Sequence, residues 1–260
     1  MEIKKGDYVT RNSYDNDTIF KVMNIKNNIC YLKGVDVRLY ADSGIDDLVK
    51  IEYNKDNQED VVVEEIPKND RDEFFYLPGK ILHIDGDDDY LKRCLKYYKE
   101  AGVFAVGKKI SEANIYECII DLLKEYKPDI VIITGHDAYY KKRNDVNNIK
   151  NYKNSENFVK AIHQARRYES SHEKLVIIAG ACQSDYEALI KAGANYASSP
   201  KRINIHALDP AIIATSLSLT ERNKLIDLPA LLDKTKYGKD GIGGIIGNGL
   251  MYVGYPRQWI

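Results

Sequence analysis

The stretch KLVIIAGACQSDYEALIKAG, residues 174–193, decides the fold class. Its first half is a continuous apolar run, which is typical of a strand buried on both faces of a parallel sheet. Its second half reads as a helix that opens with a capping box from Ser184 to Glu187 and ends at Gly193. Cys182 lies in the break between them. The stretch therefore predicts a strand, a turn and a helix, with a thiol at the carboxyl end of the strand.

Similar units repeat along the chain from Gly79 onwards. Strands are expected at 80–86, 103–106, 130–135, 175–180 and 195–199, and helices at 89–102, 111–127 (capped by Ser111), 155–169, 184–193 and 209–219 (capped by Asp209). Alternating strands and helices predict an α/β fold, a doubly wound parallel sheet covered on both faces. The expected strand order is 2-1-3-4-5, as in flavodoxin-like and caspase-like folds.

The chain divides into three regions by composition. Residues 1–52 alternate short β-like runs with turn signals such as YDND and KNN, which indicates a small SH3-like antiparallel β-barrel. Residues 53–78 are polar and acidic and are expected to be a linker that ends in an aromatic cluster. Residues 79–260 form the α/β domain. Its glycine-rich end, from about residue 221, is expected to hold close-packed loops and a terminal hairpin.

Charge and hydropathy exclude several function classes. The 260 residues include 38 basic and 39 acidic side chains, a net charge of −1, which favours neither nucleic acid nor an anionic membrane as partner. The apolar runs are far shorter than the roughly 20 residues of a membrane-spanning helix. The N-terminal stretch MEIKKGDYVTRN has no apolar signal core, so we expect an intracellular protein when it is made. No cofactor is expected, and the cluster DGDDD lacks the spacing of a calcium loop.

A histidine and a cysteine end two neighbouring strands of the predicted sheet. The run DIVIITGHD places His136 at the tip of the strand 130–135, and Cys182 follows the next strand. A thiolate can attack a carbonyl while an imidazole takes and returns the proton. The backbone N–H groups of Cys182 and Asp137 are candidate oxyanion donors. His206, after the fifth strand, is a rival base.

The same strand ends allow a receiver-type signalling domain. Asp85, Asp87 and Asp88 resemble its metal-binding acids, and DYEALIKAGANYASSP resembles the stretch after its fourth strand. A receiver needs a phosphoacceptor aspartate where this chain has Thr134-Gly135-His136. Phosphotransfer is therefore rejected, and a non-enzymatic receiver-like docking protein stays as the alternative.

The paired ends IITGHD and IIAGAC resemble those of caspase-like (clan CD) cysteine peptidases, with Asp137 in place of the usual glycine after the histidine. The chain as a whole resembles the YabG family of sporulation-specific peptidases. The resemblance rests on GDYVTRNSYDND, LHIDGDDDYL, DIVIITGHDAYY, VIIAGACQSDYEALIKAGANYASSP and GKDGIGGIIGNGLMYVGYPR. It implies proteolysis of spore coat and germination proteins, in the mother cell and spore coat, with arginine preferred before the cleaved bond. With this resemblance, the non-enzymatic alternative is a receiver-like docking protein in spore coat assembly.

An arginine preference requires a carboxylate in the substrate pocket, because a guanidinium pairs with a bidentate acid. Asp85 and Asp87, at the end of the first strand, are the candidates. Their alternative role is to cap the following helix. An arginine-specific peptidase could also cut itself after Arg71, in the linker, or after Arg143, in the insert that follows His136.

Overall fold

The structure is a computed structural model that describes residues 2–53, 73–140 and 145–257. The chain forms two compact units, residues 1–62 and residues 63–260. Each unit has its own hydrophobic core.

The first unit is a five-stranded antiparallel sheet in the order β4-β3-β2-β1-β5. Its strands are β1 (Tyr8–Arg11), β2 (Phe20–Lys26), β3 (Ile29–Gly34), β4 (Tyr40–Gly44) and β5 (Leu48–Ile51), with short 3-10 helices at Asn12–Tyr14 and Ile45–Asp47. Inward-facing Val9, Phe20 and Leu32 are at most 1% exposed and lie in its core. The antiparallel sheet was expected. Within residues 2–53 the pairings run from β4 to β5 and do not close into a ring, so the expected barrel is an open sheet by its hydrogen bonds.

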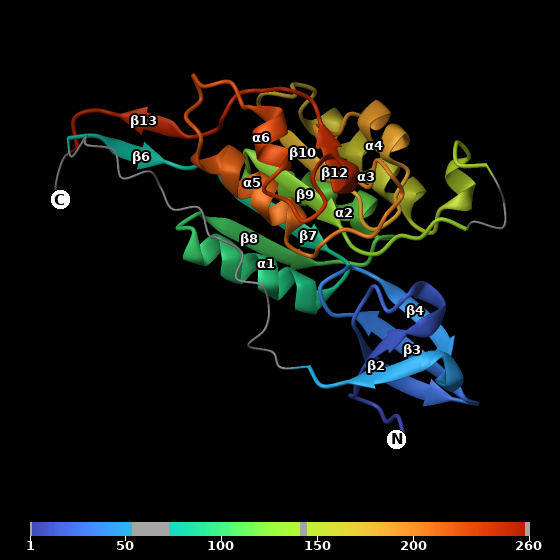
Figure 1. Cartoon of the computed structure of the whole chain (residues 1–260). Helices are drawn as coiled ribbons and strands as arrows, with labels where there is room; N and C mark the ends of the chain where they lie inside the picture. Colours follow the sequence, from blue (N-terminus) through green and yellow to red (C-terminus); the bar gives the residue numbers. More distant parts are fainter. Residues whose placement is uncertain (1, 54–72, 141–144, 258–260) are drawn as a thin grey trace. The chain divides into compact units, whose positions relative to one another are not determined.

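The second unit is built on a six-stranded sheet in the order β12-β11-β10-β9-β7-β8 (Figure 1). The strands are β7 (Ile81–Asp85), β8 (Ala105–Lys109), β9 (Ile130–Thr134), β10 (Val176–Ala179), β11 (Tyr196–Ser198) and β12 (Ile242–Gly244). The five expected strands are parallel and follow the predicted relative order. The complete order differs from the prediction, because β12 adds a sixth, antiparallel strand beside β11.

Helices cover both faces of this sheet (Figure 1). They are α1 (Asp88–Glu100), α2 (Ile115–Tyr126), α3 (Ser155–Tyr168), α4 (Tyr186–Ala192), α5 (Asp209–Leu219), α6 (Leu228–Leu232) and α7 (Gly238–Gly241), with a 3-10 helix at Ile149–Asn151. Helices α2, α3 and α4 pack on one face, and α1 and α5 pack on the other. All residues of β7, β9 and β10 are buried, which explains the apolar sequences of β9 and β10; β7 also buries His83 and Asp85.

The C-terminal region differs from the sequence prediction. No terminal hairpin forms in its described part, because β13 (Tyr252–Gly254) pairs with β6 (Phe75–Leu77) instead. Strand β6 lies in the last part of the expected linker, while linker residues 54–72 lie outside the described residues. The two short helices α6 and α7 were not predicted, because the sequence around them is rich in glycine and lysine.

Three predicted helix caps were wrong by one to three residues. Asp185, not Ser184, caps α4 and accepts from the Ala188 N–H at 3.2 Å. Helix α2 begins after Asn114, and Ser111 instead opens a turn in which its carbonyl accepts from Asn114 N–H. Asp209 lies in the first turn of α5, after the cap position. Of the three observed caps, only Asp185 makes a side-chain hydrogen bond to its helix.

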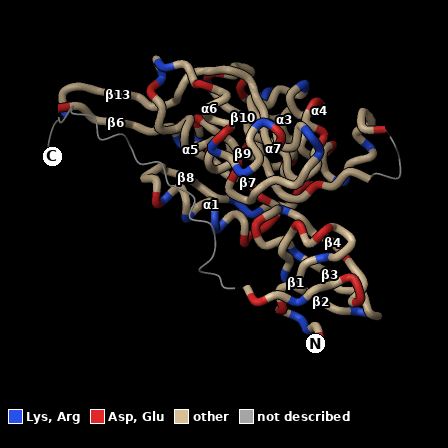
Figure 2. Tube along the Cα trace, viewed as in Figure 1, with Lys and Arg blue, Asp and Glu red and all other residues tan. Residues whose placement is uncertain are grey.

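Charged groups of both signs are scattered over the chain, and Lys and Arg lie beside Asp and Glu on helices such as α1 and α3 (Figure 2). Among the described residues, no helix is both long enough and apolar enough to cross a membrane.

Arg166 joins the end of α3 to the loops around β10. Its guanidinium donates to the carbonyls of Gly193 and Leu175, each at 2.8 Å, and to Asn195 Oδ1 at 2.6 Å. Burial lowers the pKa of Arg166 to about 10, which still leaves the group charged at neutral pH. The side chain therefore satisfies several acceptors at once, which a lysine could not reach together.

We expect Arg166→Lys to lower the free energy of unfolding by about 2–3 kcal/mol, because carbonyls that accept from a charged donor lose it. The exposed neighbour Arg167 provides the matched control, and Arg167→Lys should leave stability unchanged. Urea denaturation followed by circular dichroism measures both. Equal midpoints for the two variants would contradict this role of Arg166.

Candidate active site

The register of three parallel strands brings the predicted site residues to one edge of the sheet. Ile133 of β9 pairs with Ala179 of β10, so His136 and Cys182 each lie three positions beyond that pair. Neighbouring strands are about 4.8 Å apart. The Thr134 hydroxyl donates to Gly180 O at 2.8 Å and joins the two strand ends. On the other side of β9, Asp85 of β7 pairs with Thr134.

Cys182 is fully buried, with 0% of its surface exposed. Its sulfur accepts a hydrogen bond from Ile205 N–H at 3.3 Å and lies 3.8 Å from Ile205 O. The next residue, Gln183, has a positive φ of 57° and donates its N–H to Ile203 O. The thiol is thus covered by the main chain that follows β11.

His136 is 9% exposed and lies between two carboxylates. Its Nδ1 is 3.3 Å from Glu112 Oε1, and the same oxygen accepts from the backbone N–H of His136 at 2.7 Å. Its Nε2 is 3.7 Å from Asp87 Oδ2. The ring also packs against Tyr90, with centroids 5.9 Å apart.

Asp137 is 2% exposed and its carboxylate joins two loops. Oδ2 accepts from Ser155 Oγ at 2.5 Å and from Ser184 Oγ at 2.9 Å, and Oδ1 accepts from Asn154 N–H at 2.7 Å. Burial raises the pKa of Asp137, and these donors oppose that rise. A carboxylate so enclosed cannot serve as an exposed phosphoacceptor, which weighs against the receiver alternative.

Ser184 and Asn154 connect this network to the candidate dyad. The Ser184 hydroxyl accepts from Ala181 N–H at 2.9 Å, next to Cys182. The Asn154 side chain donates to His136 O at 2.7 Å. Asp137 thereby holds the main chain beside both predicted catalytic residues.

The two predicted arginine-pocket residues have structural partners. Asp85 is fully buried; its Oδ1 accepts from Asp87 N–H at 2.9 Å and its Oδ2 lies 3.6 Å from His83 Nε2. Asp87 is the N-cap of α1 and accepts from Asp89 N–H at 2.9 Å and Tyr90 N–H at 3.2 Å. The helix-capping role is therefore confirmed for Asp87, whose other oxygen faces His136.

His206, the rival base, follows the residue that touches the thiol. Its Nδ1 accepts from Leu208 N–H at 3.3 Å, and its own N–H donates to Asp209 Oδ2 at 3.0 Å. One ring nitrogen of His206 thus serves the turn that leads into α5.

Sequence reasoning missed Glu112, Ser155 and Ser184 as parts of the site. Glu112 lies in the loop after β8, at the same carboxyl edge, so its position after a strand was the available signal. Ser155 and Ser184 read as ordinary residues of helix starts.

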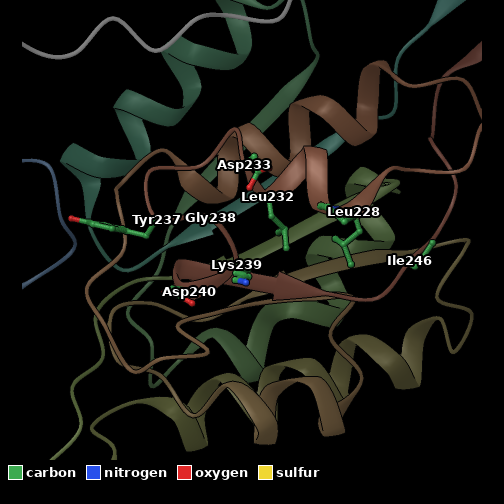
Figure 3. A pocket seen from close by; sticks show the side chains of 9 residues that line it. Leu228, Leu232, Asp233, Tyr237, Gly238, Lys239, Asp240 and Ile246 are labelled. Carbon is green, nitrogen blue, oxygen red and sulfur yellow. The ribbon is translucent and has the colours of Figure 1, made fainter.

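A cavity of about 620 Å³ lies between α6, α7 and the segment after β12, and none of the predicted site residues lines it (Figure 3). Its walls are apolar at Leu228 and Leu232 and carry Asp233, Lys239 and Asp240. Within residues 2–53, 73–140 and 145–257, no three His, Cys, Asp or Glu side chains are grouped so that they could hold a metal ion.

Comparison with known proteins covers almost the whole chain. Residues 4–68 and 53–256 match the family model described as YabG peptidase U57. The chain is 38% identical over 290 aligned residues to the sporulation-specific protease YabG of Bacillus subtilis (strain 168), with 99% of each chain covered. A crystal structure of a cobalamin-binding protein from Desulfitobacterium hafniense DCB-2 is 21% identical, covers 53% of this chain and 58% of its own, and has a TM-score of 0.33. On the family match and the full-length relative, the chain belongs to the YabG peptidase U57 family.

Proposed function

We propose that this peptidase is a cysteine endopeptidase with Cys182 as nucleophile and His136 as general base. The observation that carries the proposal is the strand register. Ile133 of β9 pairs with Ala179 of β10, and His136 and Cys182 each follow that pair by three residues. A thiol and an imidazole at adjacent strand ends are the minimum for nucleophilic catalysis on a carbonyl.

The reaction follows from these two groups. His136 takes the proton of the Cys182 thiol, and the sulfur attacks the carbonyl carbon of the scissile bond. When the tetrahedral intermediate collapses, the C–N bond breaks and the imidazolium gives its proton to the leaving amine. A water molecule, deprotonated by His136, then hydrolyses the thioester and releases the acid product.

The developing oxyanion needs hydrogen-bond donors that are already in place. We assign this role to the backbone N–H groups of Cys182 and Asp137. The hydrogen bonds of the Asp137 carboxylate hold both loops, which supports a fixed position for these two amides.

We propose that the enzyme prefers arginine before the cleaved bond and that Asp87 is the recognising carboxylate. Asp87 Oδ2 lies 3.7 Å from His136 Nε2, so this oxygen is beside the reacting groups. Asp85 is fully buried behind it and fits a supporting role, because its Oδ1 accepts from Asp87 N–H. A partly desolvated carboxylate pairs strongly with a guanidinium.

The biological setting follows from the family. The Bacillus subtilis relative is a sporulation-specific protease, and we propose that this chain also acts during sporulation, in the mother cell and the spore coat. Its proposed substrates are spore coat and germination proteins. The competing proposal of a non-enzymatic docking protein predicts no peptide hydrolysis at all.

We expect Cys182→Ala to abolish hydrolysis of a fluorogenic peptide with arginine before the reporter, and His136→Ala to lower kcat about 10²–10⁴-fold. His163→Ala, on the exposed side of α3, is the matched control and should retain full activity. Activity that survives Cys182→Ala would exclude the cysteine mechanism. If His206→Ala abolishes hydrolysis and His136→Ala does not, His206 is the general base.

We expect Asp87→Asn to reduce the preference for arginine over glutamine peptides by about tenfold or more, because a charged hydrogen bond is lost. Asparagine is also a good N-cap, so α1 should stay intact. The control is Asp88→Asn, an exposed first-turn residue paired with Lys92. Asp240, which lines the cavity at α6 and α7, is the competing carboxylate. If Asp240→Asn changes the arginine preference and Asp87→Asn does not, the arginine pocket lies at α7 and not after β7.

We also propose self-processing after Arg71 or Arg143, both outside the described residues. Intact mass should fall during incubation of the parent protein, while Cys182→Ala stays full length. Arg71→Ala and Arg143→Ala variants then identify the site. A parent protein that keeps its full mass at high concentration would contradict self-processing.

A further inference from the structure

We propose that Glu112 is the positioning residue that orients His136 for proton transfer, an inference that rests on the proposed cysteine-peptidase function. It adds a carboxylate, supplied by the loop between β8 and α2, to the pair of Cys182 and His136.

One oxygen of Glu112 contacts His136 twice. Oε1 accepts from the backbone N–H at 2.7 Å and lies 3.3 Å from the ring Nδ1. A main-chain contact and a ring contact to the same atom restrict both the position and the rotation of the side chain. With Nδ1–H donating to Glu112, Nε2 is the nitrogen that exchanges a proton with the thiol.

Two glycines leave the space that this carboxylate occupies. A Cβ atom added to Gly86, after β7, would lie 2.3 Å from Glu112 Oε1, and a Cβ at Gly135, after β9, would lie at the same distance. In both cases all three nearest heavy atoms belong to the Glu112 side chain. Neither glycine has a positive φ, so backbone conformation does not explain why glycine stands at these two positions. The residues after β7 and β9 therefore leave a hollow between them, and the Glu112 carboxylate fills it.

The turn before α2 holds Glu112 in this hollow. Ser111 O accepts from Asn114 N–H at 2.9 Å and closes a turn around Glu112. The helix itself starts only at Ile115, so the polar residues before it are available to face the sheet edge. The side chain of Glu112 is 14% exposed, which shields its contact with His136 from water.

The charges around His136 are consistent with an ionised Glu112. Burial acts to raise the pKa of Glu112, but hydrogen bonds from the His136 ring, from its own backbone and from the His136 N–H outweigh it and hold the pKa below its usual value. Asp87 faces the other ring nitrogen at 3.7 Å, and the Tyr90 ring packs beside it. The imidazole thus lies between two carboxylates, of which Glu112 is the nearer.

A purely structural role for Glu112 makes different predictions. A residue that only anchors the loop before α2 would lower stability and reduce activity equally at every pH. A residue that orients and charges the imidazole changes kcat and the shape of the pH profile while the fold is kept.

The first experiment compares Glu112→Gln and Glu112→Ala with the parent enzyme and with Glu117→Gln, an exposed acid on α2, as control. We expect kcat to fall about tenfold in Glu112→Gln and about 10²-fold in Glu112→Ala, with KM changed less than about twofold. The acidic limb of the kcat/KM profile should move to lower pH in both, because His136 acts as a neutral base and its protonated form loses a neighbouring negative charge. Glu112→Gln should keep the Tm of the parent.

The second experiment uses the glycines. Gly135→Ala should lower kcat in the parent, because the new methyl group displaces the Glu112 carboxylate. In the Glu112→Ala background the same change meets no side chain and should add little further loss. Such non-additivity in a double-mutant cycle is expected only if Gly135 acts through Glu112. The same double-mutant cycle with Gly86→Ala tests the contact of Glu112 with the residue that follows β7.

The outcomes separate this inference from the proposed function. Hydrolysis that persists in Cys182→Ala, or no hydrolysis by the parent, overturns the cysteine-peptidase proposal and with it the role of Glu112. If hydrolysis needs Cys182 and His136 but Glu112→Gln keeps the parent kcat and pH profile, only the Glu112 inference fails. The Glu112 inference also fails if Glu112→Gln lowers the Tm while the pH profile of kcat/KM keeps its shape. It fails as well if Gly135→Ala lowers kcat by the same factor in the Glu112→Ala background as in the parent.

Discussion

The carboxylate of Asp137 joins the two loops on which the candidate site depends. A parallel sheet fixes where strands end, but the residues beyond the last ladder hydrogen bond need other restraints. Here Ser155 and Ser184 donate to one oxygen of Asp137, and Asn154 donates to the other through its backbone. Each donor also holds a neighbour of the site, so the turns after β9 and β10 cannot move independently. Without this buried anion, strand register alone would leave the positions of the thiol and the imidazole undetermined.

Buried or partly buried carboxylates are costly unless donors satisfy them, and this edge of the sheet carries several. Asp85, Asp87, Glu112 and Asp137 each accept at least one backbone N–H. Main-chain amides cannot lose a proton or rotate away, so they stabilise the anions without competing for the reacting groups. The same bonds close the turns after β7 and β9 and start α1. One set of hydrogen bonds therefore both stabilises the carboxylates and fixes the conformation of the loops.

Much of the fold was predictable from local pattern, because buried parallel strands such as IVIIT and capped amphipathic helices have strong signals. Strand β12 had none: it is only IGG, yet it pairs with β11. Its glycines are required by packing, since a Cβ at Gly244 would lie 2.4 Å from the Tyr196 ring. Glu112 was likewise unpredictable, because its contact with His136 joins two loops through the tertiary structure. Short-range pattern identifies the strand ends but not which loop residues fold over them.

With Cys182 as the proposed nucleophile, the main chain that covers the thiol sets a condition on catalysis. Ile205 touches the Cys182 sulfur with both its N–H and its carbonyl, and the thiol has no exposed surface. Arg202 holds the same segment to the rest of the domain through Tyr152 and Glu187, and its own φ is positive at 55°. A peptide carbonyl can meet the sulfur only when the main chain at Ile205 withdraws. In the proposed mechanism, the substrate main chain would then replace the hydrogen bond that the thiol loses.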